Sequence, residues 1–249
     1  MNSANGSLYN PPLARGLGAT PVVFVVDDDI SVRKSLDSLI RFSGWRPRTF
    51  ASAQEFLSHP RVLAPSCLVL NVTLPDFSGL DLQRKLATER ADMPIIFITG
   101  DVDVPMTVRA MKAGAVEFLT KPYADEMLLG AIEHALERSA AALEHDAEMR
   151  RIRDSYASLS HREQQVMALV VRGLINKRVG AELGISEITV KAHRGRVMRK
   201  MQADSLAELV QIAARLPLSS PRIGFLPTRT SPGRTALFRR SGLSADAVG

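Results

Sequence analysis

Between Pro21 and Arg138, short apolar runs alternate with longer amphipathic stretches, and this alternation constrains the fold more than any other feature of the chain. The apolar runs are rich in β-branched residues, as buried strands are, whereas the stretches between them carry apolar residues at helical spacing. The predicted strands are 22–26, 46–50, 67–70, 95–99 and 117–119, and the predicted helices are 30–42, 52–58, 80–88, 104–113 and 125–137. Five successive strand–helix units predict an α/β doubly wound fold, a five-stranded parallel sheet with helices on both faces.

Polar residues stand where these strands end, and in such a sheet the ligand site lies beyond the carboxyl ends of the strands. They are, in chain order, Asp27, Asp28, Asp29, Asn71, Thr99 and Lys121. Carboxylate oxygens beside a lysine suit a magnesium ion and a phosphoryl group. A single Asp after a strand more often caps a helix than binds a ligand. The prediction of a magnesium and phosphoryl site therefore rests on the whole set of residues in this order.

Residues 20–138 resemble the receiver domain of bacterial two-component response regulators, which has a flavodoxin-like fold. The matching segments are Val26–Asp29, Leu74–Gly79, Ile98–Gly100, Met111–Ala115 and Phe118–Pro122. The resemblance implies that an Asp at the end of the third strand accepts a phosphoryl group and that Asp27 and Asp28 hold Mg²⁺. It also implies that Thr99 and Lys121 contact the phosphoryl oxygens, that Phe118 reports the switch, and that the Lys121–Pro122 bond is often cis.

Asn71 stands at the position of the phosphoacceptor Asp, and this is the main departure from the family pattern. A neutral amide is a very poor nucleophile, so we expect phosphorylation at this position to fail and assign no catalytic residue. One anionic ligand is also lost, so we expect any Mg²⁺ site at Asp28 to be weakened and no cofactor to be required. Asn71 is interpreted as a hydrogen-bonded isostere; its deamidation to Asp is the alternative, slowed by the β-branched Val72.

The second half of the chain has a different charge and pattern. Residues 20–140 carry a net charge of −3, whereas residues 155–216 carry +5, which indicates two domains, the second facing a polyanion. Residues 139–154 predict a helical linker, and helices at 160–172, 176–183, 187–201 and 205–214 predict an all-α four-helix domain at 155–216 with a helix-turn-helix. The tails, 1–19 and 217–249, have the composition of disordered segments.

The third of these helices has two distinct faces. Val190, Val197 and Met201 share the side expected to pack on the core. The opposite side carries Lys191, Ala192, Gly195, Arg196 and Arg199. Small residues beside long donors suit a helix that enters the major groove of DNA, although a basic solvated face without a partner is the alternative. His193, at the core edge, is interpreted as structural or as a phosphate donor.

Residues 158–216 resemble the LuxR-type helix-turn-helix domain. The matching segments include Leu159–Ser160, Arg162–Glu163, Asn176–Lys177, Leu183–Ser186, Thr189–His193 and Leu209–Val210. Together the two halves resemble a FixJ/NarL-type response regulator, which implies transcriptional control and a homodimer formed on DNA through the last helix. By family position Lys191 and Ala192 read bases. The other DNA-binding candidates are Lys177, Thr189, Arg194, Arg196 and Arg199.

Three functions remain open on the sequence. The first is a DNA-binding transcription regulator whose receiver is not phosphorylated at the usual position. The second is a conventional phospho-switch that uses Asp28 or Asp76, and the third is an interaction protein that titrates a sensor histidine kinase or a sibling regulator. An enzyme is not expected. The single cysteine, Cys67, and the lack of a signal peptide or long apolar run indicate a soluble cytoplasmic protein without a membrane partner.

Overall fold

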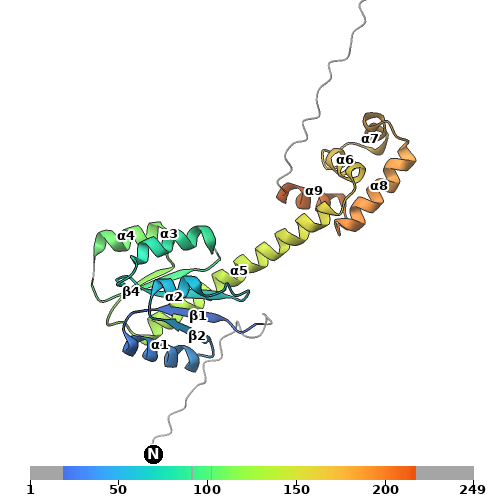
Figure 1. Ribbon diagram of the computed structural model, residues 1–249. Coiled ribbons are helices and arrows are strands. Elements are labelled where there is room, and N and C mark those ends of the chain that lie inside the picture. Colours follow the sequence, from blue (N-terminus) through green and yellow to red (C-terminus); the bar gives the residue numbers. More distant parts are fainter. Residues whose placement is uncertain (1–18, 91, 102, 217–249) are drawn as a thin grey trace, which may run out of the picture.

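The computed structural model describes residues 19–90, 92–101 and 103–216, which form two lobes joined by one long helix (Figure 1). The predicted disordered tails, 1–19 and 217–249, lie outside the described residues, apart from Ala19. Among the described residues, no helix is both long enough and apolar enough to span a membrane.

The first lobe is built on a five-stranded parallel sheet in the order β2-β1-β3-β4-β5. Its strands are β1 (Val22–Val26), β2 (Arg46–Phe50), β3 (Ser66–Asn71), β4 (Ile95–Thr99) and β5 (Glu117–Thr120). The predicted doubly wound fold is confirmed, and β3 is one residue longer at each end than predicted. Strand β2 is added on one side of β1, and β3, β4 and β5 are added on the other side, so the strand order reverses between β1 and β3. A ligand site is expected at this reversal point in such folds.

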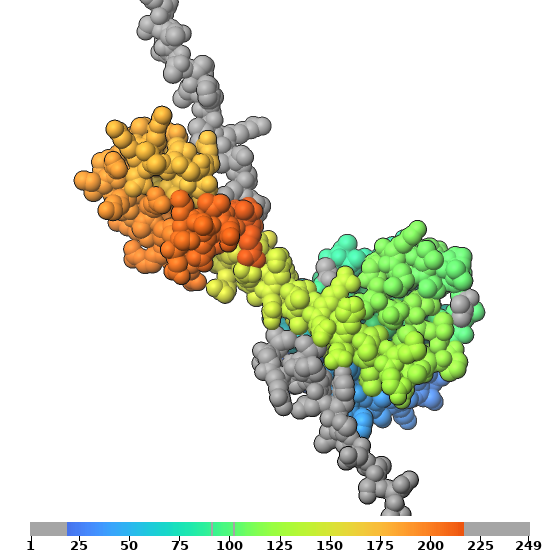
Figure 2. Space-filling view, turned by 180° about the vertical axis from the view of Figure 1, so that it is seen from behind, coloured from blue at the N-terminus to red at the C-terminus, as the bar shows by residue number. Residues whose placement is uncertain are grey.

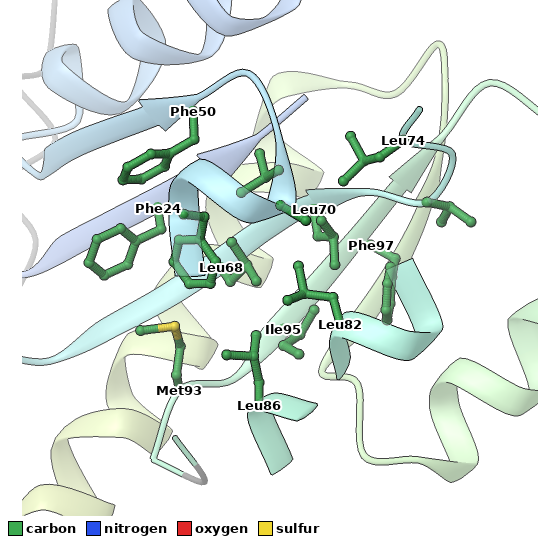
Figure 3. Close-up of a cluster of buried hydrophobic side chains, with 14 of the residues drawn as sticks. Phe24, Phe50, Leu68, Leu70, Leu74, Leu82, Leu86, Met93, Ile95 and Phe97 are labelled. Carbon is green, nitrogen blue, oxygen red and sulfur yellow. The ribbon is translucent and has the colours of Figure 1, made fainter. Parts of the chain in front are cut away.

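The helices of this lobe cover both faces of the sheet. They are α1 (Ile30–Phe42), α2 (Ala53–Ser58), α3 (Gly79–Glu89), α4 (Val104–Lys112) and α5 (Asp125–Ala157). Side chains alternate along β1, so that Phe24 packs with α2 and α3 on one face while Val23 and Val25 pack with α1 and α5 on the other. Figure 3 shows the first of these clusters, where Phe24 and Leu68 of the sheet lie with Leu82 and Leu86 of α3.

Helix α5 has 33 residues and runs without a break from the sheet to the second lobe. The sequence predicts a helix at 125–137 that a helical linker, 139–154, continues, and the structure has one continuous helix over both segments. Leu128, Ile132 and Leu136 are buried against the sheet, whereas Ile152 belongs to the core of the second lobe. At 1.5 Å per residue the helix spans about 50 Å, which separates the two lobes visible in Figure 2.

The second lobe is the predicted four-helix unit. It consists of α6 (His161–Val170), α7 (Asn176–Leu183), α8 (Glu187–Lys200) and α9 (Leu206–Arg215). Ser160, Ser186 and Ser205 each cap the helix that follows, and the predicted capping box of Ser160 and Glu163 is confirmed. Helix α6 ends two residues before the predicted Arg172, because the chain turns at Gly173, where φ is +87°.

The turn between α7 and α8 depends on close packing at Gly180. A Cβ atom at this position would lie 2.7 Å from the carbonyl oxygen of Ile185, whereas a Cβ at Gly195 would meet nothing within 4 Å. We therefore expect Gly180→Ala to lower the free energy of unfolding of the second lobe by about 1–3 kcal/mol. Gly195→Ala is the matched control and is expected to leave stability unchanged or raise it. Hydrogen exchange of the α7 and α8 amides measures both; equal protection in the two variants would contradict the packing argument.

Candidate receiver pocket and nucleic-acid interface

The carboxyl ends of β1, β3, β4 and β5 bring the predicted pocket residues to one edge of the sheet. The side chain of Asp27 is 1% exposed, and its Oδ2 lies 2.8 Å from Nζ of Lys121. The other carboxylate oxygen, Oδ1, accepts a hydrogen bond from the backbone amide of Asp29 at 2.9 Å. The Lys121–Pro122 bond is cis. The buried carboxylate is therefore both neutralised and hydrogen-bonded by the protein itself, as a buried charge requires.

Asn71 is the last residue of β3, and its side chain contacts Asp28 and Thr73. Its amide nitrogen donates hydrogen bonds to Oδ1 of Asp28 at 3.1 Å and to the carbonyl oxygen of Thr73 at 3.0 Å. Both partners are acceptors only, so a carboxylate in place of the amide would lose these two bonds and face Asp28 as a like charge. The backbone amide of Val72 donates to the carbonyl oxygen of Ile98, which withdraws the nitrogen that would attack Asn71 in deamidation. This geometry agrees with the isostere interpretation.

The donor set around Asn71 does not fit a resident Mg²⁺ ion. The amide nitrogen of Asn71 donates a hydrogen bond to Oδ1 of Asp28. The two carboxylate oxygens of Asp27 accept hydrogen bonds from Lys121 and from the backbone amide of Asp29. Among the described residues, no group of three or more His, Cys, Asp or Glu side chains is arranged to hold a metal. Hard divalent cations favour several oxygen ligands with negative charge, and of the two predicted ligands, Asp27 and Asp28, only Asp28 has a carboxylate oxygen without a hydrogen bond to the described residues.

The remaining predicted pocket residues lie at the same edge but are engaged locally. The hydroxyl of Thr99 donates to the carbonyl oxygen of Asp101 at 2.9 Å and accepts from the amide of the same residue. Phe118 is half-buried against the core, its ring centroid 6.1 Å from that of Phe97. Asp29 caps α1 by accepting from the amide of Ser31, the ordinary role of an Asp after a strand.

Asp76 has a structural role that the sequence did not indicate. Its carboxylate accepts from the backbone amides of Gln54 at 3.1 Å and Ala53 at 3.5 Å, at the N-terminus of α2. The carboxylate thus satisfies amides that no intrahelical partner can reach. No sequence pattern links positions 22 and 23 residues apart, so this contact was visible only in the fold. It argues against Asp76 as a phosphoacceptor.

Helix α8 presents the face that the sequence predicted. Val190 and Val197 are buried in the core of the second lobe, and Lys191, Ala192, Arg196 and Arg199 are exposed on α8, as is Lys177 in the first turn of α7. Thr189 is exposed, and its hydroxyl lies 2.8 Å from that of Ser186 within the helix cap. The exposed cations Lys191, Arg196 and Arg199 make the outer face of α8 basic.

Two predicted residues of α8 are placed differently from the others. Nη1 of Arg194 donates to Oδ1 of Asn176 at 3.3 Å, and the side chain is half-buried between α8 and α7. It lies about 60° around the helix from the buried Val197 rather than on the exposed face. Its contact with DNA stays a prediction, and the structure gives it a second role in joining the two helices. Nδ1 of His193 is buried without a hydrogen-bond partner in the part of the chain that the structure describes.

The side chain of Glu163 joins the start of α6 to the end of α8. Its Oε2 accepts from Nζ of Lys200 at 2.8 Å and from the backbone amide of Ser160 at 2.9 Å, and its side chain is 5% exposed. The hydrogen bond from Lys200, together with that from Ser160, lowers the pKa of Glu163 to about 2. This ion pair was not predicted, because the two residues are 37 positions apart.

The depressed pKa of Glu163 predicts a pH-dependent stability. A carboxylate with a lowered folded-state pKa stabilises the fold above its ordinary pKa, and that contribution is lost as the pH falls towards about 2. We expect Glu163→Gln to cost about 1–3 kcal/mol at pH 7, with the difference from the parent protein shrinking below pH 4.5. Hydrogen exchange of the α6 and α8 amides across this pH range measures it, and a difference independent of pH would contradict the assignment.

The comparisons with known proteins match both lobes. Residues 23–133 match the response regulator receiver domain, and residues 157–213 match the bacterial regulatory proteins of the luxR family. The chain is 51% identical to Nodulation protein W of Bradyrhizobium diazoefficiens over 80% of this chain and 88% of that protein. It is 40% identical to the transcriptional regulatory protein FixJ of the same species over 78% of this chain and 94% of that protein.

A solved structure matches both domains as well. The response regulator StyR is 46% identical and aligns with a TM-score of 0.74 over 80% of this chain and all of StyR. The alignment with StyR includes both the parallel sheet and the helical lobe of this chain. The chain belongs to the FixJ/NarL-type response regulators, transcriptional regulators in which a receiver domain precedes a LuxR-type DNA-binding domain.

Proposed function

We propose that this response regulator binds its DNA sites without phosphorylation of the receiver. The observation that carries the proposal is the amide of Asn71, which donates to Asp28 and Thr73 where the family has a phosphoacceptor carboxylate. An amide cannot form the acyl phosphate, and the amide nitrogen of Asn71 is already engaged by two acceptors of the protein. The receiver then has no enzymatic role, and contact with a protein controls it.

The exposed basic face of α8 supports the assignment of the DNA-binding residues. Lys191 and Ala192 are proposed to read bases, because they lie exposed in the N-terminal half of the helix. Lys177, Thr189, Arg194, Arg196 and Arg199 are proposed to contact the backbone, where cations and hydroxyls position the protein. The boundaries proposed for the receiver, the linker and the DNA-binding domain are 20–138, 139–154 and 155–216.

Helix α9 supports a homodimer on DNA. Leu206 and Val210 are one helical turn apart and are 37% and 40% exposed, which leaves an apolar stripe for a second copy. The other side of α9 is fixed to α5, because Arg215 binds the carboxylate of Glu148 with both guanidinium nitrogens. Two chains joined through α9 would place two copies of α8 on paired half-sites.

The surface of α4 supports a protein partner for the receiver, a second copy or a sensor histidine kinase. Val104, Val108 and Met111 are exposed at positions that share one side of the helix. Aliphatic side chains gathered on one helix face are typical of contact surfaces. Because the proposed ligand is chromosomal DNA, the proposed location is the cytoplasm of a bacterium.

Selection from a random duplex pool tests the proposal. The full-length, unmodified protein is incubated with the pool at near-physiological salt, and bound duplexes are recovered and sequenced over several rounds. The expected result is one sequence with paired half-sites. Recovery of unselected DNA, whose binding disappears as salt is raised, would show that the domain has only nonspecific affinity in this state and would overturn the proposal.

A further inference from the structure

Ile188 is the most exposed of the large apolar side chains in the part of the chain that the structure describes. It stands in the first turn of α8 and is 83% exposed. Single exposed apolar residues are common on protein surfaces, so exposure alone indicates nothing. The position of Ile188 within the exposed face of α8 is what distinguishes it.

The helical phase places Ile188 in the middle of the face proposed to meet DNA. At about 100° per residue, it lies within about 60° of Lys191, Ala192 and Gly195, and roughly opposite the buried Val190 and Val197. The N-terminal residues of a recognition helix are the ones that approach base edges. Ile188 therefore precedes Lys191 and Ala192 on the same exposed face of the helix.

The next residues on this face leave room for a close approach. Ala192 carries only a methyl group, and a Cβ added to Gly195 would meet nothing within 4 Å, so no contact with residues 19–90, 92–101 or 103–216 requires a glycine there. Glycine inside a helix costs stability relative to alanine, which points to a requirement from outside the molecule. Because the side chains at the centre of its exposed face are small, α8 can lie deep in the major groove of DNA. This brings the branched side chain of Ile188 to the base edges.

We propose that Ile188 is a specificity-determining residue that packs against the 5-methyl group of a thymine in each half-site. The methyl group of thymine is the apolar feature of the major groove, and an aliphatic side chain has no hydrogen bond to offer any other base edge. The inference rests on the proposed function, since it requires specific DNA binding. It adds to the contacts of Lys191 and Ala192 a requirement for thymine.

Uracil substitution tests the proposal one methyl group at a time. In the duplex recovered by selection, each thymine is replaced in turn by deoxyuridine, which keeps the base pairing and lacks only the methyl group. For the full-length protein we expect one position in each half-site to weaken binding by about fourfold, and both together by about fifteenfold, the effect of one buried methyl-sized group. Ile188→Ala is expected to bind the thymine and uracil duplexes within twofold of each other.

Ile175 provides the matched control. It is also an isoleucine exposed in the helix-turn-helix, at 65%, but it caps the start of α7 instead of standing on α8. Ile175→Ala should keep the full preference for thymine. Circular dichroism checks the folding of both variants, which replace exposed side chains.

The outcomes separate this inference from the proposed function. A selected site without thymine in its half-sites, equal binding of thymine and uracil duplexes by the parent protein, or an unchanged preference in Ile188→Ala would each overturn the role of Ile188 while specific DNA binding stands. Failure to select any sequence would overturn the proposed function and this inference with it.

Discussion

Asn71→Asp is expected to convert a receiver that takes up no phosphate into one that is phosphorylated by a small acyl phosphate. In the variant a carboxylate oxygen attacks phosphorus, and the carboxylate of the donor leaves, so that a new acyl phosphate forms on residue 71. Lys121 and Thr99 lie at the same sheet edge, where we expect them to contact the phosphoryl oxygens of the variant. With Mg²⁺ present we expect about one phosphoryl group per chain, against none for the parent protein. Intact-mass spectrometry under nondenaturing acid-free conditions measures the uptake.

The same substitution should change the response to Mg²⁺. The variant places two carboxylates together where Asn71 now donates to Asp28 at 3.1 Å, so without a divalent cation we expect the receiver to lose about 1 kcal/mol of stability. Added Mg²⁺ should restore the loss in the variant and leave the parent unchanged. Asp76→Asn in the Asn71→Asp background is the control and should still take up phosphate, because Asp76 caps α2. Phosphate on Asp28 or Asp76 of the parent protein would contradict the account.

Lys191→Ala is expected to weaken binding to the selected duplex by roughly 30-fold or more, on the order of one lost base contact of at least about 1 kcal/mol in each of two half-sites. Binding to a scrambled duplex should change much less, so the ratio between the two falls. Lys112→Ala removes the same charge from the exposed end of α4, in the other lobe, and should change neither affinity. Fluorescence anisotropy with both duplexes at fixed salt measures the ratio. An equal loss on both would assign Lys191 to the backbone instead of to a base.

The sequence predicted β1, β3 and β4 because each contains a continuous apolar run, whereas β2 and β5 carry polar residues and give a weaker pattern. Val22–Val26 and Ile95–Thr99 are buried on both faces, and burial of this kind leaves little ambiguity about the element. The resemblance likewise placed Asp27, Asn71 and Lys121 in one pocket, which the fold brings together at the carboxyl edge of the sheet.

The features that escaped prediction depend on residues far apart in the chain. The Asp76 cap on α2, the Glu163–Lys200 pair and the Arg215–Glu148 pair join elements separated by 22 to 67 positions. Periodicity describes only neighbours along a helix or strand, so it carries no information on such contacts. The same limit explains why the hydrogen bond between Arg194 and Asn176, 18 positions apart, was not predicted.

Ile188 shows a different limit. Its phase could be calculated from the sequence, since it stands three and four positions before Lys191 and Ala192. Apolar residues in a helix are ordinarily assigned to the core, and only the exposed fraction of 83% separates Ile188 from that role.

DNA binding by this protein is proposed to be independent of receiver phosphorylation, and one titration can decide it. The full-length protein is titrated onto its selected duplex with and without an acyl phosphate donor and Mg²⁺, with Asn71→Asp in parallel. We expect the affinity of the parent protein to be the same in both conditions within twofold, whereas that of the variant should change with the donor. A tenfold or greater rise in the affinity of the parent protein on addition of the donor would contradict it.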